Sequence, residues 1–259
     1  MLYKVLKFFL FKFDPETIHE FLLKILSFPG VPCFLKFLYG SDAWNSPVDY
    51  FGVRFKNRVG LAAGFDKNGV ALKAWEALGF GFVEIGTVTP RPQSGNPKPR
   101  LFRFSAQHAL VNAMGFNNEG IERVVQRIQK AKLELSIGLS IGKNKDTPLI
   151  DAWKDYVACI QVANDCVDFF VVNISSPNTP QLRELQKPKY LKELLEKILT
   201  HARRPLLLKL SPDLSDSEIL DIMQICKPLS LSGFVASNTG LFKKAQILGA
   251  RGGATEAYL

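Results

Sequence analysis

The residues best suited to chemistry lie in one polar segment, Asn173-Ile174-Ser175-Ser176-Pro177-Asn178-Thr179-Pro180. It follows the apolar run Phe169 to Val172, a pattern typical of a strand that is buried on both faces. Proline fixes the backbone angles beside it, so the Ser176 hydroxyl can be held in one orientation among carboxamide donors and acceptors. The segment therefore predicts a loop that binds or attacks a substrate, although an ordinary Asn/Ser/Pro turn has the same composition.

The same alternation of an apolar run and a polar turn recurs along the chain. The other runs are Val59 to Ala63, Phe82 to Gly86, Ser136 to Ile141, Leu206 to Leu210 and Gly233 to Ala236. Strands that alternate with helical stretches favour βαβ units and a parallel sheet. Polar residues directly after such strands occupy the end where (β/α)8 barrels carry their sites. We therefore expect an α/β fold of the TIM-barrel type. It should be incomplete, because we find six strands and a full barrel has eight.

Composition limits the class of protein. The 259 residues are 47% hydrophobic, enough for one barrel-sized core or two small domains. The four cysteines show no CxxC pair and no metal-ligand spacing, so we expect a reducing compartment and no metal site. The formal charge of +9 comes largely from scattered lysines without a compact basic stripe, so nucleic acid is not an expected partner. No cleavable signal peptide or bilayer-spanning apolar run is seen.

Residues 1–45 form a candidate N-terminal helical module, and residues 46–259 form the candidate barrel. Asp14-Pro15-Glu16 is typical of a helix start, and Phe28-Pro29-Gly30 of a helix end. The apolar residues of the first helix recur at helical spacing, with lysines between them, at Leu2, Val5, Leu6, Phe9, Leu10 and Phe13. The module is either a cap packed on the barrel or a helical pair lying on an anionic membrane surface. The second interpretation would admit a lipid-soluble substrate past His19.

Several motifs together resemble the dihydroorotate dehydrogenase family, in its quinone-dependent, membrane-associated class. Besides the segment around Ser176, they are GLAAGFDKNG (60–69), EIGTVTPRPQ (84–93), NPKPRLFR (96–103), NAMGFNN (112–118) and IGKNKDT (141–147). The resemblance covers nearly the whole chain in order. It implies oxidation of dihydroorotate to orotate with FMN, in pyrimidine synthesis. Electrons would pass to a membrane quinone, with the protein peripheral on the cytoplasmic side of the cell membrane.

The resemblance also assigns roles to individual residues. Ser176 would be the base that removes a proton from C5 of dihydroorotate, with Thr179 and Phe116 shaping a proton route. The expected substrate-binding residues are Lys67, Asn112, Met114, Gly115, Phe116, Asn173, Asn178, Asn238 and Thr239. The expected flavin-binding residues are Ala62, Ala63, Gly64, Thr87, Ser140, Asn173, Lys209, Ser237 and Gly253. His19 and Arg103 match residues of the quinone tunnel.

The chain departs from the family pattern at several points. Ser140 replaces an Asn, Ser237 replaces a Thr, and the run 251–256 replaces a Gly-Gly-Leu-Ser-Gly segment. The two strands that we do not find supply the usual phosphate site of this fold. An alternative is therefore a catalytically inactive, truncated barrel without the FMN phosphate site. A soluble FMN barrel that uses fumarate or NAD is a third hypothesis, which Ser176 and the amphipathic N-terminus oppose. The stretch Pro90 to Pro99 is interpreted as a rigid connection only.

Overall fold

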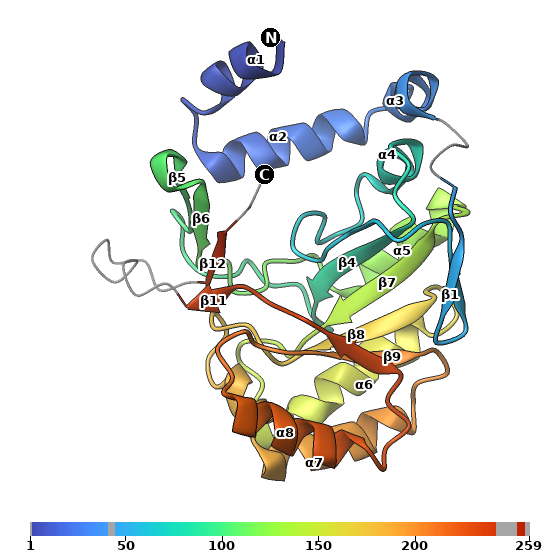
Figure 1. Cartoon of the computed structure of the whole chain (residues 1–259), viewed down its shortest axis with the longest axis vertical. Helices are drawn as coiled ribbons and strands as arrows, with labels where there is room; N and C mark the ends of the chain where they lie inside the picture. Colours follow the sequence, from blue (N-terminus) through green and yellow to red (C-terminus); the bar gives the residue numbers. More distant parts are fainter. Residues whose placement is uncertain (1, 41–44, 242–252, 257–259) are drawn as a thin grey trace.

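A computed structural model describes residues 2–40, 45–241 and 253–256. Its centre is a parallel sheet of six strands in the order β10-β9-β8-β7-β4-β3 (Figure 1). The strands are β3 (Gly60–Leu61), β4 (Phe82–Val88), β7 (Ser136–Ile141), β8 (Phe169–Asn173), β9 (Leu206–Lys209) and β10 (Gly233–Val235). Each coincides with one of the six predicted apolar runs. Because all six are parallel, their carboxyl ends lie along one edge of the sheet.

Helices cross between the strands and pack on the sheet. They are α4 (Leu72–Ala77), α5 (Ile121–Ala131), α6 (Ala152–Ala163), α7 (Pro188–Leu199) and α8 (Asp216–Cys226). The short 3-10 turns are η2 (Ser105–Gln107), η3 (Leu149–Asp151) and η4 (Leu182–Gln186). In α5 the buried residues recur at helical spacing: Ile121, Val124, Val125 and Ile128. They form one apolar face of this otherwise charged helix, and that face packs on the core. Ile85, Leu139 and Phe170 of the sheet have no exposed surface.

A hairpin closes the amino-terminal end of the sheet. It consists of β1 (Val48–Tyr50) and β2 (Val53–Phe55), joined by Phe51 and Gly52, both with positive φ. The Phe55 ring lies 5.1 Å from the Phe82 ring and 5.9 Å from the Phe169 ring, centroid to centroid. Phe82 and Phe169 begin β4 and β8, so this aromatic cluster fills the floor of the fold. Any site must therefore open at the other end.

A small antiparallel sheet stands over the carboxyl ends of the strands. Its order is β11-β12-β6-β5, with β5 (Leu101–Phe104), β6 (Ala109–Asn112), β11 (Gly240–Leu241) and β12 (Gly253–Glu256). The sequence patterns did not predict it, because its strands have two to four residues each. In Figure 1 it rises from the side of the parallel sheet towards the N-terminal helices.

Three helices form the N-terminal module: α1 (Leu2–Leu10), α2 (Pro15–Leu26) and α3 (Val31–Tyr39). The Asp14 carboxylate caps α2 by accepting a hydrogen bond from the Thr17 backbone N–H at 2.8 Å, as the sequence predicted. The module packs on β5 and α4 on one side and exposes aromatic rings such as Phe37 (85% exposed) on the other. Within the described residues no single helix is long and apolar enough to cross a bilayer. The α2–α3 pair, bent by 86°, passes that criterion only by length and composition.

Candidate active site

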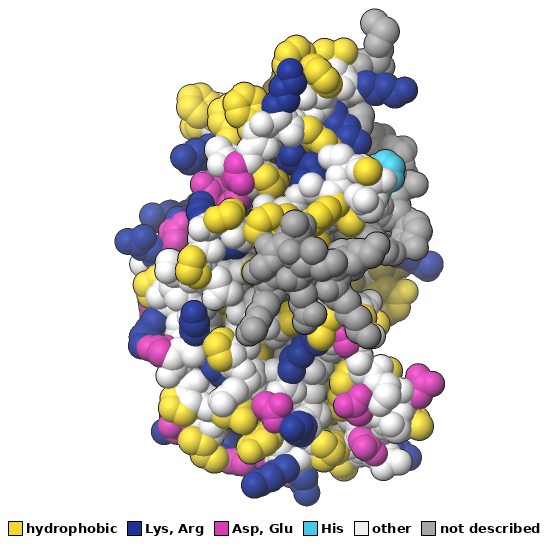
Figure 2. Space-filling model, turned by 90° about the vertical axis from the view of Figure 1, so that its left-hand side faces the viewer, with side chains coloured by type: hydrophobic (Ala, Val, Ile, Leu, Met, Phe, Trp, Pro, Cys, Tyr) yellow, Lys and Arg dark blue, Asp and Glu magenta, His cyan; other side chains and the backbone are white. Residues whose placement is uncertain are grey.

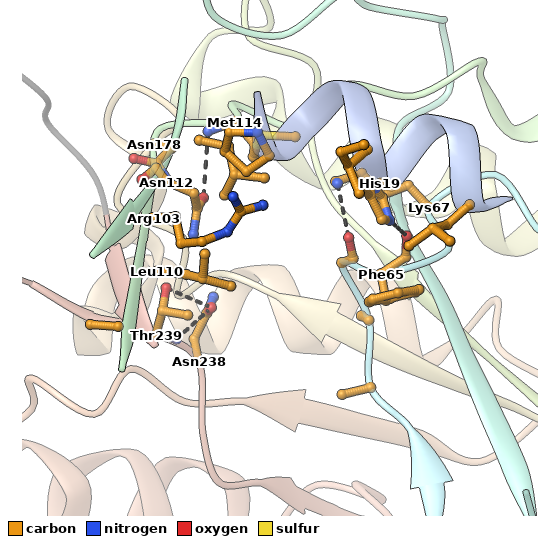
Figure 3. Close-up of a pocket in the computed structure, with 18 of the residues that line it drawn as sticks. His19, Phe65, Lys67, Arg103, Leu110, Asn112, Met114, Asn178, Asn238 and Thr239 are labelled. Atoms are coloured by element: carbon orange, nitrogen blue, oxygen red, sulfur yellow. Dashed lines mark hydrogen bonds between the residues drawn. The ribbon is translucent and has the colours of Figure 1, made fainter. Parts of the chain in front are cut away.

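One cavity of about 770 Å³ lies between the carboxyl ends of the parallel strands, the antiparallel sheet and helices α1 and α2. It brings together residues that are far apart in the sequence (Figure 3). The predicted residues on its wall are His19, Ala62, Ala63, Gly64, Lys67, Thr87, Arg103, Asn112, Met114, Gly115, Phe116, Asn173, Ser176, Asn178, Lys209, Asn238 and Thr239.

The loop after β8 is held rigidly where it enters the cavity. Asn173 Nδ2 donates to Thr87 Oγ1 at 2.8 Å, and Asn173 Oδ1 accepts from the Ser175 hydroxyl at 3.1 Å. Arg183 Nε donates to the Ser175 carbonyl at 2.9 Å. These contacts fix the next residue, Ser176, which is 7% exposed and whose Oγ accepts the Asn178 backbone N–H at 3.3 Å. A hydroxyl is thus fixed at the cavity wall.

Carboxamides form a polar wall beside this hydroxyl. Asn178 Nδ2 donates to both the carbonyl and the side-chain oxygen of Asn112, at 3.3 Å each. Asn238 Nδ2 donates to Ser175 Oγ at 2.9 Å, and its Oδ1 accepts the Thr239 backbone N–H at 2.8 Å. Figure 3 shows Asn112, Asn178, Asn238 and Thr239 together on one side of the cavity, with His19 and Lys67 across from them. Such a wall suits a planar ligand with amide edges.

Lys67 is presented by a loop that is anchored to α4. The neighbouring Asp66 is fully buried, and its carboxylate accepts hydrogen bonds from the Val70 N–H, the Ala71 N–H and Trp75 Nε1, all at 2.9 Å. Lys67 Nζ donates to the Gly64 carbonyl at 2.9 Å. Burial of the ammonium within the cavity wall lowers the pKa of Lys67 to about 8, an effect that the charge of Glu16 partly opposes. The side chain is therefore a cation poised for an anionic partner.

A second cation, Lys209, lines the cavity and is buried. Lys209 is 6% exposed, and its Nζ lies 3.8 Å from Glu84 Oε1, beyond hydrogen-bond length. That Glu84 oxygen is buried and accepts no hydrogen bond within the described part of the chain. The opposite wall is built from the small residues Ala62, Ala63 and Gly64, and a side chain at Gly64 would project into open space. A flat ring with polar edges fits this arrangement, because the wall allows close approach and the ammonium can still donate.

Towards α1 and α2 the cavity becomes largely apolar, and His19 and Arg103 are among the polar groups on its wall there. His19 Nε2 donates to the Phe65 carbonyl at 2.7 Å, and burial and then the nearby Lys67 charge lower the pKa of the imidazole. Arg103 Nη1 donates to the Phe11 carbonyl at 3.3 Å, and its guanidinium lies 4.1 Å from the centre of the Phe11 ring. The apolar lining here is Leu6, Leu10, Phe11, Ile18 and Leu22. This branch suits a hydrophobic molecule with a hydrogen-bonding head.

Two predicted flavin residues, Ser140 and Ser237, do not line the cavity. Ser140 is fully buried behind Thr87, and the two hydroxyls share a hydrogen bond of 3.0 Å. Ser237 Oγ donates to the Asn238 carbonyl instead. Gly253 lies in β12, where its backbone pairs with Leu241 and Asn112, while Arg251 and Gly252 lie outside the described residues. Thr179 is buried, and its hydroxyl has no hydrogen-bond partner in the described structure.

Sequence reasoning missed some functional candidates. Glu84 carries a charge within an apolar strand run, and that contrast could have identified it. Asn96 and Arg100 lie in the stretch interpreted as a rigid connection only. That interpretation is incomplete, because Asn96 Nδ2 donates to the Asn178 carbonyl at 3.2 Å and so contacts the site.

Known proteins of one family resemble this chain in sequence and in fold. The family model described as dihydroorotate dehydrogenase matches residues 47–252. A dihydroorotate dehydrogenase (quinone) of Christiangramia forsetii is 46% identical over 244 residues, which are 91% of this chain and 72% of that protein. One of Vibrio parahaemolyticus is 44% identical over 251 residues, covering 93% and 74% of the two chains. A crystal structure of DHODH from Eimeria tenella in complex with ferulenol has a TM-score of 0.82 at 32% identity, over 93% of this chain and 72% of that one. The predicted fold class is thus confirmed, with six parallel barrel strands among the described residues.

Proposed function

The chain belongs to the dihydroorotate dehydrogenase family, and on that premise we propose that it oxidises dihydroorotate to orotate and passes the electrons to a membrane quinone. This is a step of pyrimidine synthesis. One observation carries the proposal: a single cavity joins the Ser176 hydroxyl, a carboxamide wall, the half-buried Lys67, the buried Lys209 and an apolar branch.

The residues divide the chemistry between them. Ser176 takes the proton from C5 of the substrate, with Phe116 and Thr179 beside its route to solvent. A hydroxyl is a weak base, so its fixed surroundings must activate it. Lys67 binds the substrate carboxylate. The substrate ring is held by the carboxamides of Asn112, Asn173, Asn178 and Asn238, and by Met114, Gly115, Phe116 and Thr239.

The cofactor that we propose is FMN. When bound, FMN would supply the redox chemistry by accepting a hydride from the substrate and passing two electrons on to the quinone. Lys209 would donate to the ring and stabilise negative charge on it, and the small residues Ala62, Ala63 and Gly64, with Thr87, would let the ring approach the backbone. Asn173 would reach the same space. Ser140, which is hydrogen-bonded to Thr87, and the exposed Ser237 beside Asn238 would complete the flavin site. Gly253 would be a further flavin contact in this proposal.

The N-terminal module, residues 1–45, is the membrane-facing part, and residues 46–259 form the barrel. His19 and Arg103 contact the quinone head in the apolar branch. Figure 2 shows hydrophobic side chains mixed with Lys and Arg over the N-terminal helices, a combination that suits a peripheral helix on an anionic surface. We place this surface on the cytoplasmic side of the cell membrane.

The visible spectrum of the purified protein, recorded before and after anaerobic dihydroorotate, tests the proposal. Flavin bands that bleach with substrate and return with a quinone analogue are expected. A folded protein that binds no FMN would instead favour the alternative, an inactive barrel without a phosphate site. The observation behind that alternative is the central sheet, which has six strands within the described residues where a full barrel has eight.

A further inference from the structure

Asn96 joins two segments of the carboxamide wall, the segment around Asn112 and the segment around Asn178. Its Nδ2 donates to the Ala113 carbonyl at 2.9 Å and to the Asn178 carbonyl at 3.2 Å. Its backbone N–H donates to the Met114 carbonyl at 3.0 Å. A carboxamide has two N–H donors, and here each is used on a different segment. The side chain therefore fixes residues 112–116 relative to residues 176–179.

Two segments of the chain, residues 95–96 and 114–115, approach each other closely. Gly115, with φ of 69°, faces the Asn96 side chain so closely that an added Cβ would lie 2.8 Å from its atoms. An added Cβ at Gly95 would collide with the Met114 carbonyl. Contact at this distance leaves the two segments little freedom, so Asn96 fixes the spacing of the wall together with the direct Asn178–Asn112 hydrogen bonds.

Arg100 holds Asn96 from behind. Its buried guanidinium donates to the Asn96 carbonyl at 2.8 Å and also to the Ser94 carbonyl. On its other side it pairs with Glu16 of α2, Nη2 to Oε1 at 2.8 Å. Burial opposes ionisation of Glu16, but the hydrogen bonds and charge of Arg100 outweigh it and lower the pKa of the carboxyl. The buried ion pair thus connects the N-terminal module to the substrate wall.

We propose that Asn96 is a positioning residue for dihydroorotate oxidation: it sets the distance between the Asn112 and Asn178 carboxamides, and Arg100 keeps it there. This inference rests on the proposed function. It predicts that loss of the two Asn96 N–H donors impairs the substrate reaction while the apolar branch is unaffected.

The test compares the wild type with Asn96→Asp, which keeps the size but cannot donate, and Asn96→Ser, which avoids a new charge. Arg91→Gln is the matched control, because Arg91 lies on the same connection and its exposed side chain pairs with Asp146. Stopped-flow absorbance measures flavin reduction by dihydroorotate and reoxidation by a short-chain quinone. Hydrogen–deuterium exchange of the ligand-free proteins measures the protection of residues 112–116 and 176–179.

Both Asn96 variants should slow flavin reduction by roughly 10- to 100-fold, as expected for a misplaced substrate, with reoxidation changed less than about twofold. Exchange should speed up about tenfold in the two segments together and nowhere else. Unchanged exchange and unchanged flavin reduction would overturn the inference, as would faster exchange spread evenly over the molecule. A wild type that does not bleach refutes the proposed function instead, and the exchange result alone then decides the role of Asn96.

Discussion

The charge of Lys67 should control how orotate affinity depends on pH. If the ammonium binds the ligand carboxylate, only the protonated side chain binds tightly. With a pKa of about 8 in the ligand-free protein, the protonated fraction falls from about nine-tenths at about pH 7 to about one-tenth at about pH 9. A bound anion raises the pKa of Lys67, so binding is strongest below about pH 8 and weakens above it. Between about pH 7 and about pH 9 the expected loss of orotate affinity is about tenfold, or about 1.4 kcal/mol.

Orotate titrations that follow the flavin spectrum, or calorimetry, between about pH 6 and about pH 10 measure this dependence. Lys67→Arg is the control, because a guanidinium stays protonated over the whole range. Any titration of the ligand itself appears in both proteins. The reasoning is refuted if the wild type loses affinity no faster than Lys67→Arg as the pH rises.

Three further predictions concern separate parts of the molecule. Ser176→Ala should slow flavin reduction by ~10² to 10⁴ with orotate affinity changed only a few-fold; an unchanged rate in the stopped flow would remove the hydroxyl from the mechanism. Glu16→Ala leaves the buried Arg100 unpaired and should lower the free energy of unfolding by about 3–5 kcal/mol in urea titrations, whereas a loss below about 1 kcal/mol would contradict the buried pair. The exposed rings of Phe9 and Phe13 should drive membrane binding. Replacing both by Ser should weaken partition to anionic vesicles by roughly 100-fold in sedimentation assays and spare flavin reduction by dihydroorotate.

Much of the fold could be predicted because buried parallel strands have continuous apolar sequences. The run Ser136 to Ile141 coincides with β7, and Phe82 to Gly86 ends two residues before β4 does. The hairpin β1–β2 and the antiparallel sheet escaped prediction, because strands of two to four residues show almost no periodicity. Moreover, β6 pairs with β12, which lies far along the chain.

The candidate site was predicted to the extent that its residues follow strands directly. Asn173 and Lys209 end strands, so a parallel sheet places them on one edge whatever the details of packing. Asn96 and Arg100 were missed because their partners are distant, 82 positions away for Asn178 and 84 for Glu16. An amide or guanidinium in a proline-rich stretch carries no local signal of such contacts.

The aromatic floor of the sheet has a consequence for how this protein can change. Phe51, Phe55, Phe82 and Phe169 pack at the amino ends of the strands, and none of them lines the cavity. Substitutions there change the stability of the folded state and leave the groups that contact a ligand unchanged. Conversely, residues around the cavity can be exchanged while the floor keeps the strands in register. Thermal stability can therefore be raised by substitutions at the amino ends of the strands, and ligand specificity can be changed by substitutions around the cavity, with little interference between the two.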